Sequence, residues 1–335
     1  MIKEAIRKLV GRTDLSRDEA AESMSEIMSG EATPAQIASF VTALHMKGET
    51  VDEITGCAET MREKAASVNC SKRPLVDCVG TGGDGSGTFN ISTAAAIVVA
   101  AAGATVAKHG NRAASSRCGS ADVLEELGVR IDLPPEKVEE CLEQAGIGFM
   151  FAPVFHQSMK HAAGPRREMG IRTIFNMVGP VTNPAGADCL LMGIFSAELT
   201  EPMASVLGNL GAKRAFVVHG DGLDEITITG PTRVSELSDG QVKTYEVTPE
   251  EIGVDTATKD DLKGGDVRRN ATIIMEVLHG EKGPPREIVV ANAGACLVVA
   301  GLAPDFRDGA ALARDTIDSG RAMDKLEQFR RVSQL

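Results

Sequence analysis

Aromatic side chains are scarce in this sequence, which has no tryptophan, one tyrosine and ten phenylalanines among its 335 residues. Proteins that bind single-stranded nucleic acid stack bases on aromatic rings, so this shortage leaves few platforms for stacking. Basic residues are also outnumbered, since 35 Lys and Arg stand against 47 Asp and Glu and give a formal net charge of −12. Because basic residues provide most of the affinity for a phosphate backbone, the charge argues against nucleic acid as a partner.

Paired cysteines and long apolar runs are missing as well. The seven cysteines are irregularly spaced and contain no Cys-x-x-Cys pair, which favours reduced, packed thiols over disulfides or a zinc site. The longest apolar run, residues 94–104, is too short and too rich in alanine to cross a membrane. Charges interrupt the first seven residues, unlike a secretory leader. We therefore expect a cytoplasmic protein that binds no membrane.

Helix signals dominate residues 1–70. Capping boxes begin at Ser16, Thr33 and Thr50, each with Glu or Gln three residues later. Apolar residues at helical spacing follow within 37–44 and 51–61. These apolar stripes fit either the core of a small helical domain or a dimer interface, and the sequence does not decide between the two.

From residue 75 apolar segments alternate with helical patterns, which predicts an α/β domain with a central, mainly parallel sheet flanked by helices. A basic helical insert at about 154–183 interrupts this alternation and is expected to pack with the N-terminal helices. The predicted domains are therefore a helical one at 1–70, joined by the insert, and an α/β one at 71–153 and 184–335. The expected strands are 75–79, 104–107, 147–151, 189–195, 214–219 and 286–291; the expected helices are 92–102, 120–127, 135–145, 201–209 and 267–279, with one more from about 309.

A glycine-rich loop follows the first expected strand and reads Gly80-Thr-Gly-Gly-Asp-Gly-Ser-Gly-Thr88, with Asn90-Ile-Ser-Thr93 opening the next helix. Glycines let backbone N–H groups approach an anion, and a helix N-terminus adds partial positive charge. A second polar loop, Lys108-His-Gly-Asn-Arg-Ala-Ala-Ser-Ser116, follows the next expected strand. Two such loops at the carboxyl ends of successive strands predict a ligand with several phosphates.

The glycine loop also satisfies the Gly-x-Gly-x-x-Gly fingerprint of dinucleotide-binding proteins. That fingerprint requires an acidic residue at the end of the next strand, where it holds a ribose hydroxyl. Here that strand ends in Lys108 and His109, and the loop carries a carboxylate of its own, Asp84. A nicotinamide cofactor is therefore disfavoured.

An acidic turn, Gly220-Asp-Gly-Leu-Asp224-Glu225, follows the strand expected at 214–219. Adjacent carboxylates at a strand end suit Mg²⁺, which favours one or two carboxylates together with water and substrate phosphates. Taken alone, the turn fits a solvated acidic turn equally well. Beside two phosphate-binding loops, the metal site becomes the better interpretation.

In their order along the chain, these motifs resemble the anthranilate phosphoribosyltransferase family. The resemblance rests on residues 80–84, 90–93, 108–112, 119–125, 172–176 and 224–225. It implies transfer of the 5-phosphoribosyl group of 5-phosphoribosyl diphosphate (PRPP) to the amine of anthranilate, with release of diphosphate, in tryptophan biosynthesis. It also implies Mg²⁺, two ions per chain, and a homodimer formed through the N-terminal helices.

The resemblance further implies the site residues, none of which acts as an acid, a base or a nucleophile. The amine of anthranilate is uncharged near neutral pH, so positioning carries more of the catalysis than a base does. For anthranilate, Arg167 is the alternative to Arg166 if Pro165 shifts the start of the helix. The implied PRPP ligands are Gly80, Gly83, Asp84, Thr88, Asn90, Ile91, Ser92, Thr93, Lys108, His109, Gly110, Asn111, Arg112, Ala113, Ala114, Ser115, Ser116 and Ser120; the anthranilate ligands are Gly80, His109, Asn111 and Arg166; the metal ligands are Ser92, Asp224 and Glu225.

Two rival functions share parts of this pattern. A pyrimidine nucleoside phosphorylase has the same fold class and a similar glycine loop, but should lack both the acidic pair and the run at 108–112. A non-catalytic relative that binds nucleic acid should have a basic groove and a degraded metal site. The net charge of −12 and the intact Asp224-Glu225 pair disfavour that relative.

Overall fold

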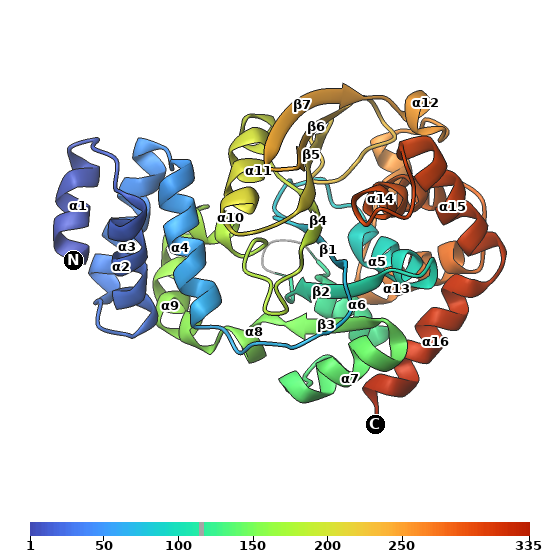
Figure 1. The fold of residues 1–335 in the computed structure, drawn as a ribbon, viewed down its shortest axis with the longest axis horizontal. Helices are drawn as coiled ribbons and strands as arrows, with labels where there is room; N and C mark the ends of the chain where they lie inside the picture. Colours follow the sequence, from blue (N-terminus) through green and yellow to red (C-terminus); the bar gives the residue numbers. More distant parts are fainter. Residues whose placement is uncertain (114–116) are drawn as a thin grey trace.

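A seven-stranded sheet runs through the middle of the computed structural model, which describes residues 1–113 and 117–335 (Figure 1). The strands lie in the order β3-β2-β1-β4-β5-β6-β7, and the first five in this order are parallel to their neighbours while β6 and β7 are antiparallel. Their bounds are β1 Leu75–Gly80, β2 Thr105–Gly110, β3 Ile147–Phe151, β4 Cys189–Gly193, β5 Arg214–Gly220, β6 Thr232–Ser238 and β7 Gln241–Val247.

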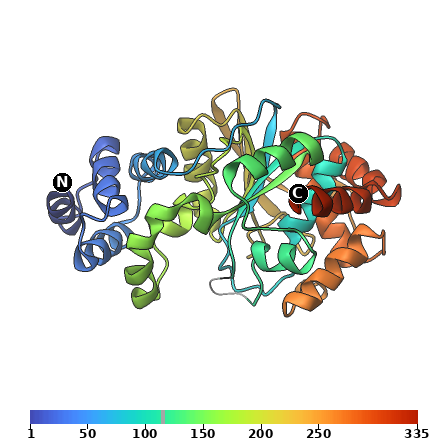
Figure 2. The ribbon, with the colours of Figure 1, turned by 90° about the horizontal axis from the view of Figure 1, so that it is seen from below.

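Four N-terminal helices form a group at one end of the molecule: α1 Ile2–Val10, α2 Arg17–Met28, α3 Pro34–Lys47 and α4 Val51–Glu63. The capping boxes at Ser16, Thr33 and Thr50 are all present, each side chain accepting from the backbone N–H three residues on. The insert contributes α8 Ala152–Phe155, α9 Lys160–Met169 and α10 Ile174–Val178. Helix α9 packs against α2 and α3, and α10 against α3 and α4, as predicted (Figure 2).

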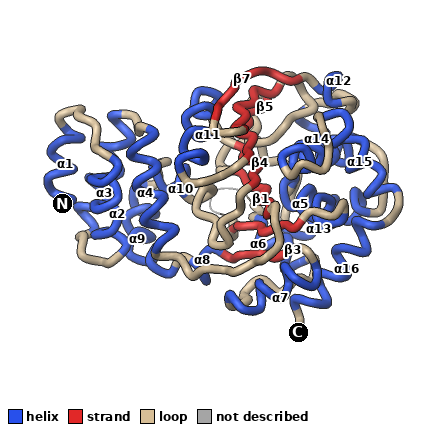
Figure 3. Tube along the Cα trace, viewed as in Figure 1, coloured by secondary structure: helices blue, strands red, loops and turns tan. Residues whose placement is uncertain are grey.

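Helices cover both faces of the sheet (Figure 3). One core joins the sheet to α5 Ile91–Ala101, α6 Ser120–Glu126, α7 Pro135–Ala145, α13 Val267–Leu278, α14 Pro284–Val299, α15 Phe306–Asp318 and α16 Arg321–Ser333. A second core joins the opposite face of β1, β4 and β5 to α11 Thr200–Asn209, α10 and the N-terminal helices. Successive residues of β4 alternate between the cores, with Leu191 in the first and Leu190 in the second.

The predicted fold class, a helical domain beside an α/β domain with a mainly parallel sheet, is confirmed. The boundaries of the two domains stay a prediction. None of the described helices is both long enough and apolar enough to cross a membrane. The expected location in the cytoplasm also stays a prediction.

Three predictions about individual elements were wrong. The strand expected at 286–291 is part of helix α14, because a short apolar run does not distinguish a buried strand from a buried helix. Pro284 and Pro285, at the start of that helix, were the available signal. The single helix expected from about 309 is two, α15 and α16, separated at Gly320. Strand β2 continues to Gly110 by pairing with β3, so Lys108 stands in a strand rather than a loop.

The hairpin of β6 and β7 was missed altogether. Its strands are largely polar, and only the turn Asp239-Gly240 marks it in the sequence. Both turn residues have positive φ, 50° and 73°, as a two-residue hairpin turn of this type requires.

The strand order reverses between β1 and β4, which makes their carboxyl ends a candidate ligand site. From β1 the chain runs outward to β2 and β3, then returns to β4 on the other side of β1. In open α/β sheets, ligands bind where the strand order reverses in this way. The glycine loop after β1 and the acidic turn after β5 both open onto this edge of the sheet.

Candidate active site

Two glycines on adjacent strands make room for the Asp224 carboxyl. Gly80 at the end of β1 lies in register with Gly193 at the end of β4. A Cβ on Gly80 would lie 2.6 Å from Asp224 Oδ2, and one on Gly193 would lie 1.6 Å from the Asp224 carbonyl oxygen. The backbone N–H of Gly82 donates to Asp224 Oδ2 at 2.6 Å. Only glycine at both strand ends allows the acidic turn to contact the sheet this closely.

The acidic turn brings three carboxyls together at the glycine loop. Asp84 Oδ2 accepts from the backbone N–H of Asp224 at 3.3 Å, and its Oδ1 accepts from the hydroxyl of Ser86 at 2.8 Å. Burial, followed by the charge of Asp84, raises the pKa of Asp224 to about 7. Burial and then Asp224 raise the pKa of Glu225 well above its usual value. Both carboxyls therefore keep a proton more readily than an exposed carboxyl does, and a nearby cation would favour their ionised forms.

Lys108 is the buried cation nearest to this group. Its side chain is 3% exposed, and its ammonium donates to the carbonyl of Cys78 and, at 3.4 Å, to Ser92 Oγ. Its charge opposes the rise in the pKa of Glu225. Lys108 thus joins the end of β1, the first turn of α5 and the acidic pair.

The N-terminus of α5 faces the same region and supplies polar groups of the glycine-loop motif. Asn90, which precedes the helix, accepts from Asn270 Nδ2 at 3.0 Å and donates to the Cys118 carbonyl at 3.2 Å. The hydroxyl of Thr93 is buried and has no hydrogen-bond partner among the described residues. Ile91 is a buried core residue, so only its backbone remains for a ligand.

Asp122 closes the second polar loop onto α6. Its Oδ2 accepts from the backbone N–H groups of Ala113 at 3.0 Å and Gly119 at 2.9 Å. Ser120 Oγ donates to the carbonyl of Asn111 at 3.3 Å. Three residues expected to bind PRPP (Ala114, Ser115 and Ser116) lie outside the described residues.

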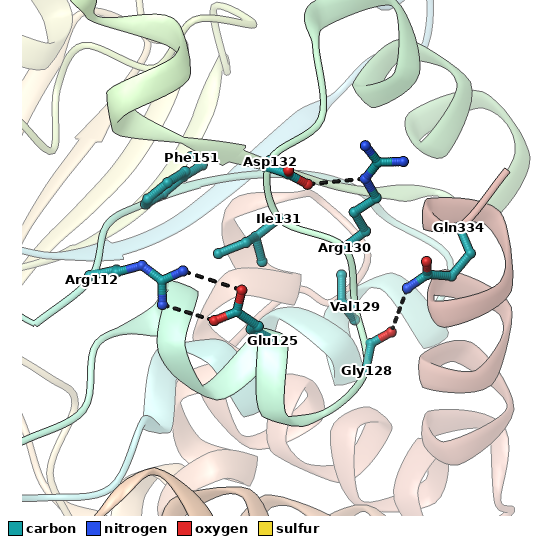
Figure 4. A pocket seen from close by; sticks show the side chains of 9 residues that line it. All are labelled: Arg112, Glu125, Gly128, Val129, Arg130, Ile131, Asp132, Phe151 and Gln334. Atoms are coloured by element: carbon teal, nitrogen blue, oxygen red, sulfur yellow. Dashed lines mark hydrogen bonds and ion pairs between the residues drawn. The ribbon is translucent and has the colours of Figure 1, made fainter.

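Arg112 forms ion pairs with α6 rather than with Asp84, Asp224 or Glu225. Its guanidinium pairs with Asp122 at 2.8 Å and Glu125 at 2.9 Å, and it lies 5.6 Å from the centre of the Phe151 ring. Figure 4 shows it in a pocket of about 320 Å³ whose lining contains no other residue expected to bind PRPP. The lining residues are Arg112, Glu125, Gly128, Val129, Arg130, Ile131, Asp132, Phe151 and Gln334.

A pair of buried histidines lies beside the end of β2. The ring centres of His109 and His156 are 5.0 Å apart, and both Nε2 atoms are buried without a hydrogen-bond partner among the described residues. Burial, followed by His156 and Lys108, lowers the pKa of His109 to about 3, and burial lowers that of His156 to about 4. Both rings are therefore neutral at physiological pH.

A buried carboxyl beneath His109 fixes its backbone. Asp77 Oδ1 accepts from the N–H of His109 at 3.3 Å, and Oδ2 accepts from Asn183 Nδ2 at 2.7 Å. Asn183 also donates to the Ala107 carbonyl at 2.8 Å, which ties the end of the helical insert to β1 and β2. Burial raises the pKa of Asp77 to about 6. The motif pattern gave no signal for Asp77 or Asn183, whereas the sequence indicated His109 and His156 as residues that line a pocket.

The insert carries two arginines that matter for the site. Arg166 on α9 is half-buried, lies 5.1 Å from the centre of the Phe175 ring within the insert, and forms no ion pair with another described residue. Loss of water around it lowers its pKa. The neighbouring Arg167 is exposed. Arg172 donates to the carbonyl of Gly83 and lies 4.5 Å from the Phe195 ring centre, so the insert contacts the glycine loop directly.

The described part of the chain does not by itself complete a metal site. Within it, no three His, Cys, Asp or Glu side chains are arranged to hold a metal ion. Carboxylates of Asp84, Asp224 and Glu225 are oxygen donors of the kind that Mg²⁺ prefers, and that ion usually keeps water or phosphate in its remaining positions.

Comparisons with known proteins give matches over almost the whole chain. Residues 72–323 match a glycosyl transferase family, a/b domain, and residues 3–65 match the helical bundle domain of a glycosyl transferase family. Anthranilate phosphoribosyltransferases of Moorella thermoacetica and Acetivibrio thermocellus are 57% and 56% identical to it, covering 98% of this chain and 97% and 96% of theirs.

Solved structures agree with this assignment. The crystal structure of the anthranilate phosphoribosyltransferase from Thermus thermophilus has a TM-score of 0.94 and 48% identity, covering 99% of both chains. The Saccharomyces cerevisiae enzyme in complex with PRPP and Mg has a TM-score of 0.90 and 27% identity, covering 99% of this chain and 98% of that one.

Proposed function

The chain belongs to the anthranilate phosphoribosyltransferase family, and on that basis we propose that it transfers the 5-phosphoribosyl group of PRPP to the amine of anthranilate in tryptophan biosynthesis. The bond from ribose C1 to the diphosphate breaks, and its electron pair leaves with the diphosphate. The amine nitrogen forms the new bond to C1 and gives up one proton. The observation that carries this proposal is Asp224 held against the glycine loop and Asp84 at the edge of the sheet, with Glu225 next to it in the chain.

The diphosphate of PRPP is proposed to lie between the glycine loop and the start of α5. Backbone N–H groups of the loop and of the first helical turn would donate to phosphate oxygens, and the helix dipole favours the negative charge. The unpartnered hydroxyl of Thr93 supports this placement, because a buried hydroxyl gains a partner there. Lys108 would hold a phosphate or ribose oxygen from the opposite side.

Mg²⁺ suits this group of neighbouring carboxyls. Asp224 and Glu225 have raised pKa values because they are buried beside other carboxyls, and a divalent cation would favour their ionised forms. Ser92, Asp224 and Glu225 would hold the metal, and we propose two ions per chain. When bound with PRPP, Mg²⁺ supplies positive charge to the leaving diphosphate.

Anthranilate is proposed to bind between the histidine pair and Arg166, bordered by Gly80 and Asn111. Two neutral imidazoles with free Nε2 atoms accept hydrogen bonds, which suits the uncharged amine of the substrate. Arg166 lacks an ion-pair partner among the described residues, so the substrate carboxylate would compensate its burial. These groups orient the amine toward ribose C1 rather than remove a proton from it.

We expect diphosphate release only when PRPP, Mg²⁺ and anthranilate are all present, because the transfer needs both substrates and charge on the leaving group. A coupled assay for diphosphate, with each component omitted in turn, measures this. Replacing anthranilate with inorganic phosphate is the control for a phosphorylase. Equal diphosphate release without anthranilate would contradict the proposal.

We expect Arg166→Ala to raise the KM for anthranilate about 10- to 100-fold, the value of a charged hydrogen-bonded pair, and to leave the KM for PRPP nearly unchanged. Steady-state kinetics with each substrate varied in turn measures the two KM values separately. Arg167→Ala is the matched control, since that neighbouring side chain is exposed, and it should change either KM by about twofold at most. If Arg167→Ala shows the selective defect instead, Arg166 does not bind the carboxylate.

A homodimer formed through the N-terminal helices is also proposed. Val10 at the end of α1 and Met46 near the end of α3 are 72% and 70% exposed, and these two helices pack against each other. Large exposed apolar side chains on one surface favour an interface. Each active site would be complete in one chain, because its loops follow strands of a single sheet.

We expect the wild type to sediment as a dimer at micromolar concentration, and Val10→Asp with Met46→Asp to sediment as an active monomer, because buried charges oppose association. Leu302→Asp, at a residue that is 45% exposed on the α/β part, is the control and should leave the dimer intact. A wild-type monomer under these conditions would exclude the dimer, and loss of activity on dissociation would exclude an independent site in each chain.

A further inference from the structure

A buried amide stands in the middle of the apolar helix α14. Residues 288–299 of this helix are all buried, and Asn292 is the one amide among them. Burying an amide in apolar surroundings costs free energy unless its hydrogen bonds are made. The contacts of Asn292 therefore indicate what this residue does in the fold.

Asn292 makes its hydrogen bonds to the single residue that follows the acidic turn and to its own helix. Its Oδ1 accepts from the backbone N–H of Ile226 at 2.9 Å, and its Nδ2 donates to the Ile226 carbonyl at 2.8 Å. The second hydrogen on Nδ2 goes to the carbonyl of Ile288 at 2.9 Å. Both backbone groups of Ile226 are thus held by one side chain, much as a neighbouring strand would hold them.

Ile226 directly follows Glu225, in a segment that has left β5 and is not in a regular element. Its side chain is fully buried, so its backbone groups have no access to water in place of the amide. Beyond it, the N–H of Thr227 donates to Thr232 Oγ1 at 3.0 Å. On the other side, the Asp224 backbone contacts the glycine loop through Asp84. Asn292 thus adds a polar link to the apolar contacts by which Leu223 and Ile226 join the acidic pair to the core.

The helix that carries Asn292 is itself fixed. A Cβ on Gly294 would lie 2.6 Å from the backbone nitrogen of Ala310, and one on Gly309 would lie 2.4 Å from the Gly294 carbonyl oxygen. Helices α14 and α15 therefore meet backbone to backbone. Helix α14 also packs against β4, β5 and α5. Because α14 is fixed by this packing, the Asn292 amide holds the Ile226 backbone in a defined position.

We infer that Asn292 is a positioning residue for the reaction: it holds the Ile226 backbone so that Asp224 and Glu225 face the glycine loop at the spacing that Mg²⁺ and the diphosphate need. This inference rests on the proposed function, since it assigns the acidic pair to metal binding. Groups that orient metal ligands without touching the metal commonly change metal affinity or activity by 10–100-fold when they are removed.

The test compares Asn292→Leu, which keeps the size and removes the amide, with Val290→Ala, which removes buried methyl groups from the opposite side of the same helix. We measure thermal stability, PRPP binding by calorimetry at varied Mg²⁺, kcat and KM, and hydrogen exchange of the segment 223–228. Asn292→Ser is the second variant, because its smaller side chain leaves room for water and keeps a folded protein available.

For both Asn292 variants we expect faster exchange in the segment 223–228, at least about a tenfold rise in the Mg²⁺ concentration needed for PRPP binding, and a lower kcat, with the KM for anthranilate unchanged. Val290→Ala should lose stability without these changes. If the Asn292 variants lose stability like Val290→Ala but keep the wild-type Mg²⁺ dependence, Asn292 is only a core residue and the inference is wrong. A wild type that binds no PRPP at any Mg²⁺ concentration would instead overturn the proposed function along with it.

Discussion

The rest of the site depends on how closely the acidic turn after β5 contacts the ends of β1 and β4. Gly80 and Gly193 are paired in register and leave room for Asp224. A side chain on either glycine would clash with Asp224. This contact sets Asp224 and Glu225 beside Asp84, where burial and like charge raise pKa values. Carboxyls arranged this way suit a cation, and they lie where the strand order reverses, the place at which open α/β sheets bind ligands.

Two cores hold this arrangement from opposite sides. On one side α14 joins the segment after the acidic pair through Asn292, and on the other the helical insert reaches the same edge through Arg172 and the histidine pair. The insert also packs against the N-terminal helices. The groups proposed to bind phosphate and metal thus lie at the ends of strands of the sheet, while the groups proposed to bind anthranilate lie mostly where the helical insert meets the sheet.

The sequence predicted the strands and loops that form the site because these carry local signals. Glycines at 80–87 and the capping boxes of the N-terminal helices act through their own backbone, so they can be identified without the fold. Residues that act through distant partners left no such signal. Asn292 looks like one polar residue in an apolar run, and that run was itself mistaken for a strand. The pairing of Arg112 with Asp122 and Glu125, and of His109 with His156, likewise depends on tertiary contacts.

The central claim is that the half-buried acidic pair is the cation site through which PRPP is held. Calorimetric titration of PRPP, with and without Mg²⁺, into the wild type and into Asp224→Asn with Glu225→Gln tests it most directly. The account predicts Mg²⁺-dependent binding to the wild type and a loss of at least about tenfold in affinity for the double variant, which should remain folded. Binding of PRPP by the double variant with the same affinity and the same Mg²⁺ dependence as the wild type would contradict it.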